Sequence, residues 1–304
     1  MKILFATDGS EGSAVALDLL LDMPLGPADH VAALSVPVHH YFALDPMGTF
    51  AAELVQAEID HAASLAEEVR KRFGARGIET SAHSDGGPVV DTTIAVARRE
   101  RCDLIVVGSR GLGAAASFLM GSVARGLVRG SEIPVLVVRD RRVAPTRVLV
   151  GVDGSADSDA SLELLMRLPL PKDATITLMH VIADVPGWPP QGLAASVKVA
   201  VDAELTRQAG VVLERASAKL GGRTVGAVLA ERGRVAKRIV DRASSDGTDL
   251  VVIGARGTAS VGRQHGTVAD EIVHGARCAV LVVRAPAPVA PRKAVAEREL
   301  VHVG

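Results

Sequence analysis

The sequence reads Asp103-Leu-Ile-Val-Val-Gly108-Ser-Arg-Gly111 and, after nine further residues, Gly121-Ser122. The arrangement returns as Asp249-Leu-Val-Val-Ile-Gly254-Ala-Arg-Gly257, followed after eight residues by Gly266-Thr267. A short apolar run that ends in glycine indicates a strand after which the backbone turns sharply. A Gly-Ser or Gly-Thr step before a helical run adds free N–H donors and a positive dipole end. The pattern therefore predicts, twice, a loop that can cradle an anion.

The chain is a tandem repeat. Asp8 and Asp153 each begin the pattern Asp-Gly-Ser-x-x-Ser after an apolar run. Pro134-Val-Leu-Val-Val-Arg139 and Ala279-Val-Leu-Val-Val-Arg284 match at the same offset. A length of 304 residues suits two domains, each large enough to bury a core. We predict domains over 1–143 and 144–286, and a peripheral, mobile tail over 287–304.

Composition excludes several classes of protein. With 48% hydrophobic but only 2% aromatic residues, the cores must be aliphatic, which suits parallel strands covered on both faces. A formal net charge of −1 and the scarcity of aromatic residues disfavour nucleic-acid binding. No apolar run approaches membrane-spanning length and no secretory signal is evident, so we expect a cytoplasmic protein that does not bind membranes. Cys102 and Cys278 lack disulfide or metal spacing and are expected to be buried thiols.

Alternating apolar and amphipathic runs predict an α/β fold of two tandem doubly wound domains, each a five-stranded parallel sheet with helices on both faces. Strands are predicted at 2–7, 31–36, 78–83, 103–107 and 134–139, and at 147–152, 174–182, 224–230, 249–253 and 279–284. Helices are predicted near 11–22, 49–73, 89–100 and 121–130, and near 157–167, 195–220, 234–245 and 267–275. Ligands of such sheets sit at the carboxyl ends of the strands, where Asp8 and Gly108 are expected.

These motifs resemble those of the universal stress protein family, here as a tandem pair of the ATP-binding type with a fold like that of the adenine nucleotide alpha hydrolases. The resemblance implies that Thr7 and Asp8 contact the nucleoside and that the Val36 main chain meets the adenine edge. It further implies that ribose and phosphates are surrounded by Gly108, Arg110, Gly111, Gly121, Ser122 and Val123. The matching residues of the second copy are Asp153, Val181, Gly254, Arg256, Gly257, Gly266, Thr267 and Val268. Binding is expected there too, although the shorter spacer shifts which amide faces the anion.

The family resemblance also suggests that the two copies pack about a pseudo-twofold axis through their last strands. A further homodimer is expected, because duplicated symmetric units readily present a second self-complementary face.

The residues leave other interpretations open. The glycines could serve only tight strand-to-helix packing, Asp8 and Asp153 could cap the following helices, and Arg110 and Arg256 could be solvated. No catalytic residue is assigned, because Gly-x-Ser-x-Gly and the P-loop lysine are both missing.

The leading hypothesis is a non-enzymatic stress-response or growth regulator whose occupancy by ATP, or by another adenine nucleotide, biases the choice of an unidentified protein partner. The alternatives are a slow ATP hydrolase or AMP-transferring enzyme, and an interaction module without nucleotide. Whether Mg²⁺ or another metal takes part stays open.

Overall fold

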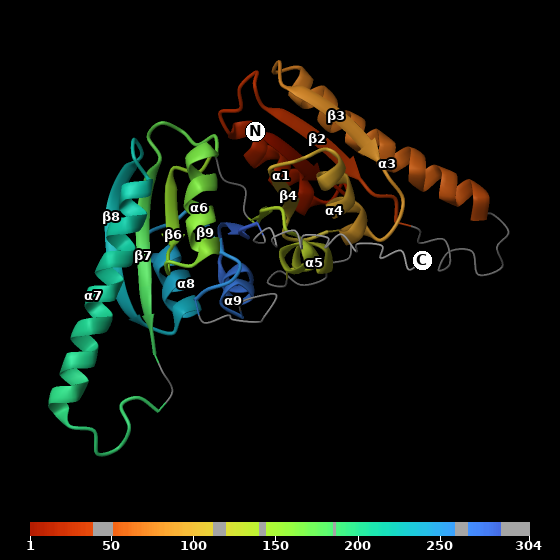
Figure 1. Cartoon of the computed structure of the whole chain (residues 1–304). Helices are drawn as coiled ribbons and strands as arrows, with labels where there is room; N and C mark the ends of the chain where they lie inside the picture. Colours follow the sequence, from red (N-terminus) through yellow and green to blue (C-terminus); the bar gives the residue numbers. More distant parts are fainter. Residues whose placement is uncertain (39–50, 112–119, 140–143, 185–186, 259–266, 287–304) are drawn as a thin grey trace, which may run out of the picture.

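The computed structural model describes residues 1–38, 51–111, 120–139, 144–184, 187–258 and 267–286 (Figure 1). The strands of the first half are β1 (Lys2–Ala6), β2 (His30–Ser35), β3 (Glu79–Ser84), β4 (Leu104–Gly108) and β5 (Val135–Val138). Those of the second half are β6 (Arg147–Gly151), β7 (Thr175–Ala183), β8 (Thr224–Gly233), β9 (Leu250–Gly254) and β10 (Ala279–Val283). Each lies at its predicted place.

The helices alternate with the strands. They are α1 (Glu11–Asp22), α3 (Ala51–Gly74), α4 (Val89–Arg99) and α5 (Ser122–Gly130) in the first half. In the second half they are α6 (Ala156–Arg167), α7 (Ala195–Lys219), α8 (Val235–Ser245) and α9 (Thr267–Gly275). These bounds agree with the predicted helices to within two residues. The predicted tail at 287–304 lies outside the described residues.

Within the described residues, the strands form one ten-stranded sheet in the order β3-β2-β1-β4-β5-β10-β9-β6-β7-β8. Pairings inside each half are parallel, so the predicted α/β fold with five parallel strands per copy is confirmed. The halves join where β5 and β10 pair antiparallel, with Leu136 opposite its counterpart Leu281. Figure 1 shows β3 and β8 at the two outer ends. The last strands thus join the copies as the resemblance suggested.

Two aliphatic layers enclose this sheet. The apolar faces of α1, α3, α6 and α7 pack in one layer, and those of α4, α5, α8 and α9 pack in the other. The central strands are buried on both sides, and all five residues of β10 are buried. Such strands read as continuous apolar runs because neither face meets water.

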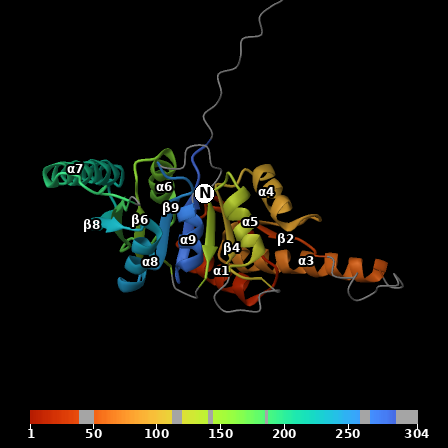
Figure 2. The same ribbon diagram turned by 90° about the horizontal axis from the view of Figure 1, so that it is seen from below.

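Side chains near β5 and β10 cross from one half to the other. Arg139 donates a hydrogen bond to the carbonyl of Val273 on α9 (2.8 Å). Arg129 on α5 pairs with Asp270 on α9 (2.6 Å). The two helices lie side by side near the middle of the molecule in both views (Figures 1 and 2).

Cys102 and Cys278 are buried thiols outside any disulfide, as expected. Burial raises the pKa of the Cys102 thiol to about 11, which keeps it protonated near neutral pH. None of the helices in the described part of the chain combines the length and apolarity that crossing a bilayer requires.

Candidate functional site

The predicted ligand loops of the first half meet at the carboxyl edge of the sheet. β1 and β4 are parallel neighbours, with Ala6 beside Val107, so the residues that follow both strands lie together. Gly121 reaches the same place, because its N–H donates to the carbonyl of Ser109 (2.8 Å). The structure therefore gathers three segments that are far apart in the sequence.

Asp8 lies where two of these segments meet. Its Oδ1 accepts hydrogen bonds from the main-chain N–H (3.0 Å) and the hydroxyl (2.5 Å) of Ser10. A side chain on Gly111 would collide with its Oδ2. The helix-capping role that the sequence left open for this aspartate belongs to Ser10, whose hydroxyl accepts from Ser13 at the start of α1.

The second half repeats this arrangement. Asp153 accepts hydrogen bonds from the N–H of Ser155 (3.0 Å) and of Thr258 (2.9 Å). A Cβ on Gly257 would lie 2.7 Å from Asp153 Oδ2. Ser155 caps α6, just as its counterpart caps α1. Asp153 therefore joins the loop after the first strand of its half to the loop after the fourth, and Asp8 lies at the matching junction of the first half.

The glycines that end β4 and β9 have a packing role. A Cβ on Gly108 would lie 2.8 Å from the nitrogen of Ser13 on α1. A Cβ on Gly254 would lie 2.9 Å from the nitrogen of Ser158 on α6. The interpretation as tight strand-to-helix packing therefore accounts for these two positions, and their glycines are required before any ligand is considered.

The start of α5 has no side-chain cap among the residues that the structure describes. Its N-cap residue Gly121 makes no side-chain capping bond, and its first turn carries no acidic residue. The N–H groups of Ser122, Val123 and Ala124 precede the first intrahelical bond, which Arg125 donates to the Gly121 carbonyl (3.1 Å). Together with the helix dipole, these N–H groups make an end that favours an anion.

Arg110 lies beside this helix end. The Cα of Arg110 is 3.6 Å from where a Cβ on Gly121 would stand. The side chain is exposed, and among the residues that the structure describes no carboxylate lies within ion-pair distance of its guanidinium. A helix start without a side-chain cap therefore lies beside a residue whose exposed cation pairs with no described carboxylate.

The other predicted residues of the first half lie just after β1, just after β2 and in the first turn of α5. Thr7 follows β1, and its hydroxyl donates to the hydroxyl of Ser13 (3.1 Å). Val36 follows β2 directly, and both Val36 and Val123 pack against the apolar layer that contains α5.

The equivalent residues of the second half are placed differently. Val181 is buried inside β7, two residues before that strand ends, whereas Val36 lies beyond β2. Thr267 is the first residue of α9 and Val268 is exposed. Gly266 lies outside the described residues.

The second half contains an ion pair that was not predicted from the sequence. Asp157, on the first turn of α6, accepts from Nε (2.9 Å) and Nη2 (2.8 Å) of Arg256. Burial alone raises the pKa of the Asp157 carboxyl, but hydrogen bonds from Arg256 and Ala285 outweigh it, and the pKa lies below its ordinary value. The signal was in the repeat: Asp157 stands where the first copy has Gly12.

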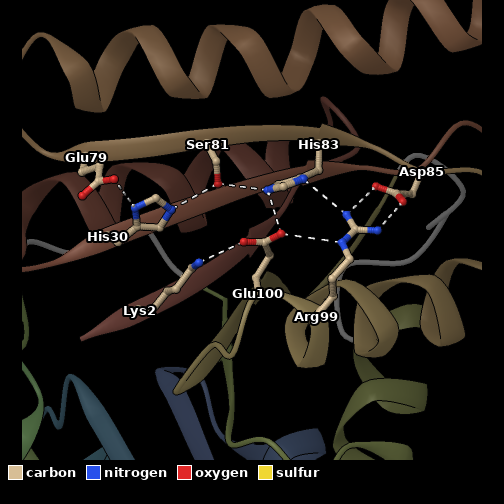
Figure 3. A network of polar contacts seen from close by, with 8 residues as sticks. All are labelled: Lys2, His30, Glu79, Ser81, His83, Asp85, Arg99 and Glu100. Carbon is tan, nitrogen blue, oxygen red and sulfur yellow. Dashed lines mark hydrogen bonds and ion pairs between the residues drawn. The ribbon is translucent and has the colours of Figure 1, made fainter.

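A separate polar network lies between β1–β3 and the end of α4 (Figure 3). The residues drawn are Lys2, His30, Glu79, Ser81, His83, Asp85, Arg99 and Glu100. Ser81 bridges the rings of His30 (3.1 Å) and His83 (2.9 Å), and Lys2 pairs with Glu100 (2.9 Å). These groups satisfy one another and fasten the C-terminal end of α4 to the outer strands. No group of three or more potential metal ligands is found among the described residues, those in the network included.

Comparison with known proteins identifies the repeat. The Universal stress protein family matches residues 1–139 and again 145–284. The universal stress protein Rv2623 of Mycobacterium tuberculosis is 29% identical over 234 residues, which cover 74% of this chain and 75% of that protein. A universal stress protein from Archaeoglobus fulgidus has a similar structure, with a TM-score of 0.65 at 23% identity over 94% of this chain and 98% of that chain.

A family protein from Arabidopsis thaliana was crystallised with AMP bound, which is a property of that protein. It covers 49% of this chain and 97% of its own, at 18% identity and a TM-score of 0.36. The family match spans nearly the whole sequence, once in each half. The chain therefore belongs to the universal stress protein family and carries two consecutive copies of its domain.

Proposed function

We propose that the first half binds an adenine nucleotide, ATP in the first place, at the carboxyl edge of β1 and β4. The observation that carries the proposal is the uncapped start of α5 beside the unpaired Arg110. Free N–H groups at a helix start, joined by a guanidinium, form the usual surroundings of a bound phosphate. Membership of a family in which adenine nucleotides are found supports the same ligand.

The flanking residues suit the rest of the nucleotide. The carboxylate of Asp8 lies next to Gly111 at this edge, and carboxylate oxygens are acceptors that suit ribose hydroxyls. Thr7 adds a hydroxyl next to it. Val36 offers main-chain groups just beyond β2 for the adenine edge. Where Mg²⁺ accompanies ATP, phosphate oxygens and water would supply most of its ligands.

The biological role we propose is regulation by occupancy in the cytoplasm, where adenine nucleotides are made and consumed. Bound nucleotide would favour one state of the chain, and that state would engage a protein partner in the response to stress. A homodimer remains our prediction for its assembly. If the chain were a slow hydrolase instead, phosphate release would follow binding during prolonged incubation with ATP.

The decisive experiment is calorimetric titration of ATP into the full chain and into the variant Arg110→Ala. Loss of a charge-assisted contact weakens affinity by roughly 10- to 100-fold. The matched control is Arg101→Ala, which removes the same charge from an exposed arginine just before β4, at the amino end of that strand and so at the opposite edge of the sheet. Unchanged affinity in Arg110→Ala, or no binding of ATP to the unaltered chain, would overturn the proposal.

A further inference from the structure

One difference between the two halves lies in the first turn of the helix that follows their first strand. In the first half this position is Gly12, where a Cβ would collide with the carbonyl of Arg110. In the second half it is Asp157, whose side chain is 3% exposed. The loop after the fourth strand therefore approaches a bare backbone in one half and a buried carboxylate in the other.

Asp157 accepts four hydrogen bonds. Three come from Arg256: its main-chain N–H (2.9 Å), Nε (2.9 Å) and Nη2 (2.8 Å). The fourth comes from the N–H of Ala285, just beyond β10 (3.0 Å). A buried carboxylate with this many donors is held firmly, because each bond to a charged acceptor is strong. At the carboxyl edge of the second half, the Asp157 carboxylate thus takes the hydrogen bonds that a bound anion would otherwise accept.

Arg256 is the counterpart of Arg110, the cation that we propose for the phosphates in the first half. The Arg256 guanidinium is already neutralised by Asp157, whereas that of Arg110 has no carboxylate partner among the described residues. A ligand phosphate would have to displace Asp157 and would then lie beside a buried negative charge. That exchange weakens binding by roughly 100-fold or more.

A second difference makes the same edge less polar. Val152, which is buried, replaces Thr7 and its hydroxyl. The ring of His180 lies against the main chain there, with Nδ1 2.8 Å from the carbonyl of Val152. The second half thus lacks a hydroxyl at the position proposed to meet the nucleoside, and a histidine ring stands against the neighbouring backbone.

We propose that Asp157 is a specificity-determining residue that closes the second half to phosphate-bearing ligands, so that each chain holds a single adenine nucleotide, in its first half. The inference rests on the proposed nucleotide site and adds its stoichiometry. It replaces the expectation of two bound nucleotides that the matching glycine spacings suggested.

The test counts ATP molecules bound per chain by calorimetry. The unaltered chain is expected to bind one equivalent, and Arg110→Ala is expected to retain no site of the original affinity. Asp157→Gly should gain a second equivalent, because it releases Arg256 and restores the residue of the first copy. Ala156→Gly is the matched control: it places a glycine in the same turn without a change in charge and should still bind one equivalent.

Two equivalents in the unaltered chain, with affinities within roughly tenfold of each other, would overturn the inference and leave the proposed function standing. So would an Arg110→Ala chain that still binds one equivalent at the original affinity. This second result decides the matter even where Asp157→Gly does not fold. Absence of binding in every protein would overturn the proposed function, and this inference with it.

Discussion

The ion pair between Arg256 and Asp157 makes a quantitative prediction about stability. In Arg256→Ala, a carboxylate that is 3% exposed loses its cation and two of its four hydrogen bonds. The main-chain N–H of residue 256 remains, so the net loss is two side-chain bonds and the charge. Removal of one member of a buried pair costs about 3–5 kcal/mol in the free energy of unfolding.

The exposure of the two partners makes their substitutions unequal. The side chain of Arg256 is 37% exposed, so in Asp157→Asn it can turn toward water. The N–H groups of Arg256 and Ala285 bind different oxygens of Asp157, so the asparagine keeps an acceptor for only one of them, but it also removes the buried charge. We expect a smaller cost of about 1–3 kcal/mol. Arg215→Ala is the matched control. Arg215 lies on α7, is 60% exposed and pairs with Asp159, which is on α6 like Asp157, and an exposed pair of this kind contributes about 1 kcal/mol or less.

The pH dependence has a definite sign. In the unaltered chain the pKa of Asp157 lies below its ordinary value, so the pair contributes stability above about pH 4 and loses it at lower pH. In Arg256→Ala the buried carboxylate has lost its cation and its pKa rises, so protonation removes the cost of the buried unpaired charge. The difference in unfolding free energy between the two proteins should therefore narrow as the pH falls from about 7 to about 4.

Urea unfolding followed by circular dichroism measures these differences. The reasoning would be refuted by an Arg256→Ala cost below about 1 kcal/mol, or by a cost that does not change with pH. A larger cost for Asp157→Asn than for Arg256→Ala would refute the assignment of the carboxylate as the more deeply buried partner.

Three further predictions concern the first half and the junction. Gly111→Ala should lower the unfolding free energy by about 1–3 kcal/mol, since its Cβ meets a carboxylate, whereas Gly121→Ala, with 3.4 Å to the nearest atom, should mainly weaken ATP binding. Burial holds the pKa of His30 below its ordinary value, so the protein should unfold at a lower urea concentration once the pH drops below about 6.5. The decrease should be smaller in His30→Gln. Arg129→Ala should leave the urea midpoint almost unchanged, because the Arg129 side chain is largely exposed; a clear drop would show that its pair with Asp270 holds the halves together.

Most of the fold could be predicted from the sequence because the central strands are continuous apolar runs between polar or glycine boundaries. The run 103–107 became β4 (Leu104–Gly108), and the helix near 195–220 became α7 (Ala195–Lys219). Because the sequence is a repeat, each predicted element could be compared with its counterpart in the other copy. The matching ends at Arg139 and Arg284 indicated that the last strands are equivalent.

The site was only partly readable. The glycine spacing predicted which loops meet, but it could not separate a glycine required by packing, such as Gly108, from one that leaves a helix start open, such as Gly121. That distinction depends on distances between segments far apart in the chain. The pairing of Arg256 with Asp157 was missed because they are 99 residues apart, although the difference from Gly12 was visible in the aligned repeats.

Native mass spectrometry of the full chain, titrated with ATP, addresses the central proposal most directly because it identifies and counts the bound molecules together. We expect one adenine nucleotide per chain, lost in Arg110→Ala and retained in Arg101→Ala. A chain that carries no nucleotide at millimolar ATP would contradict the proposal that the open start of α5 and Arg110 form a phosphate site.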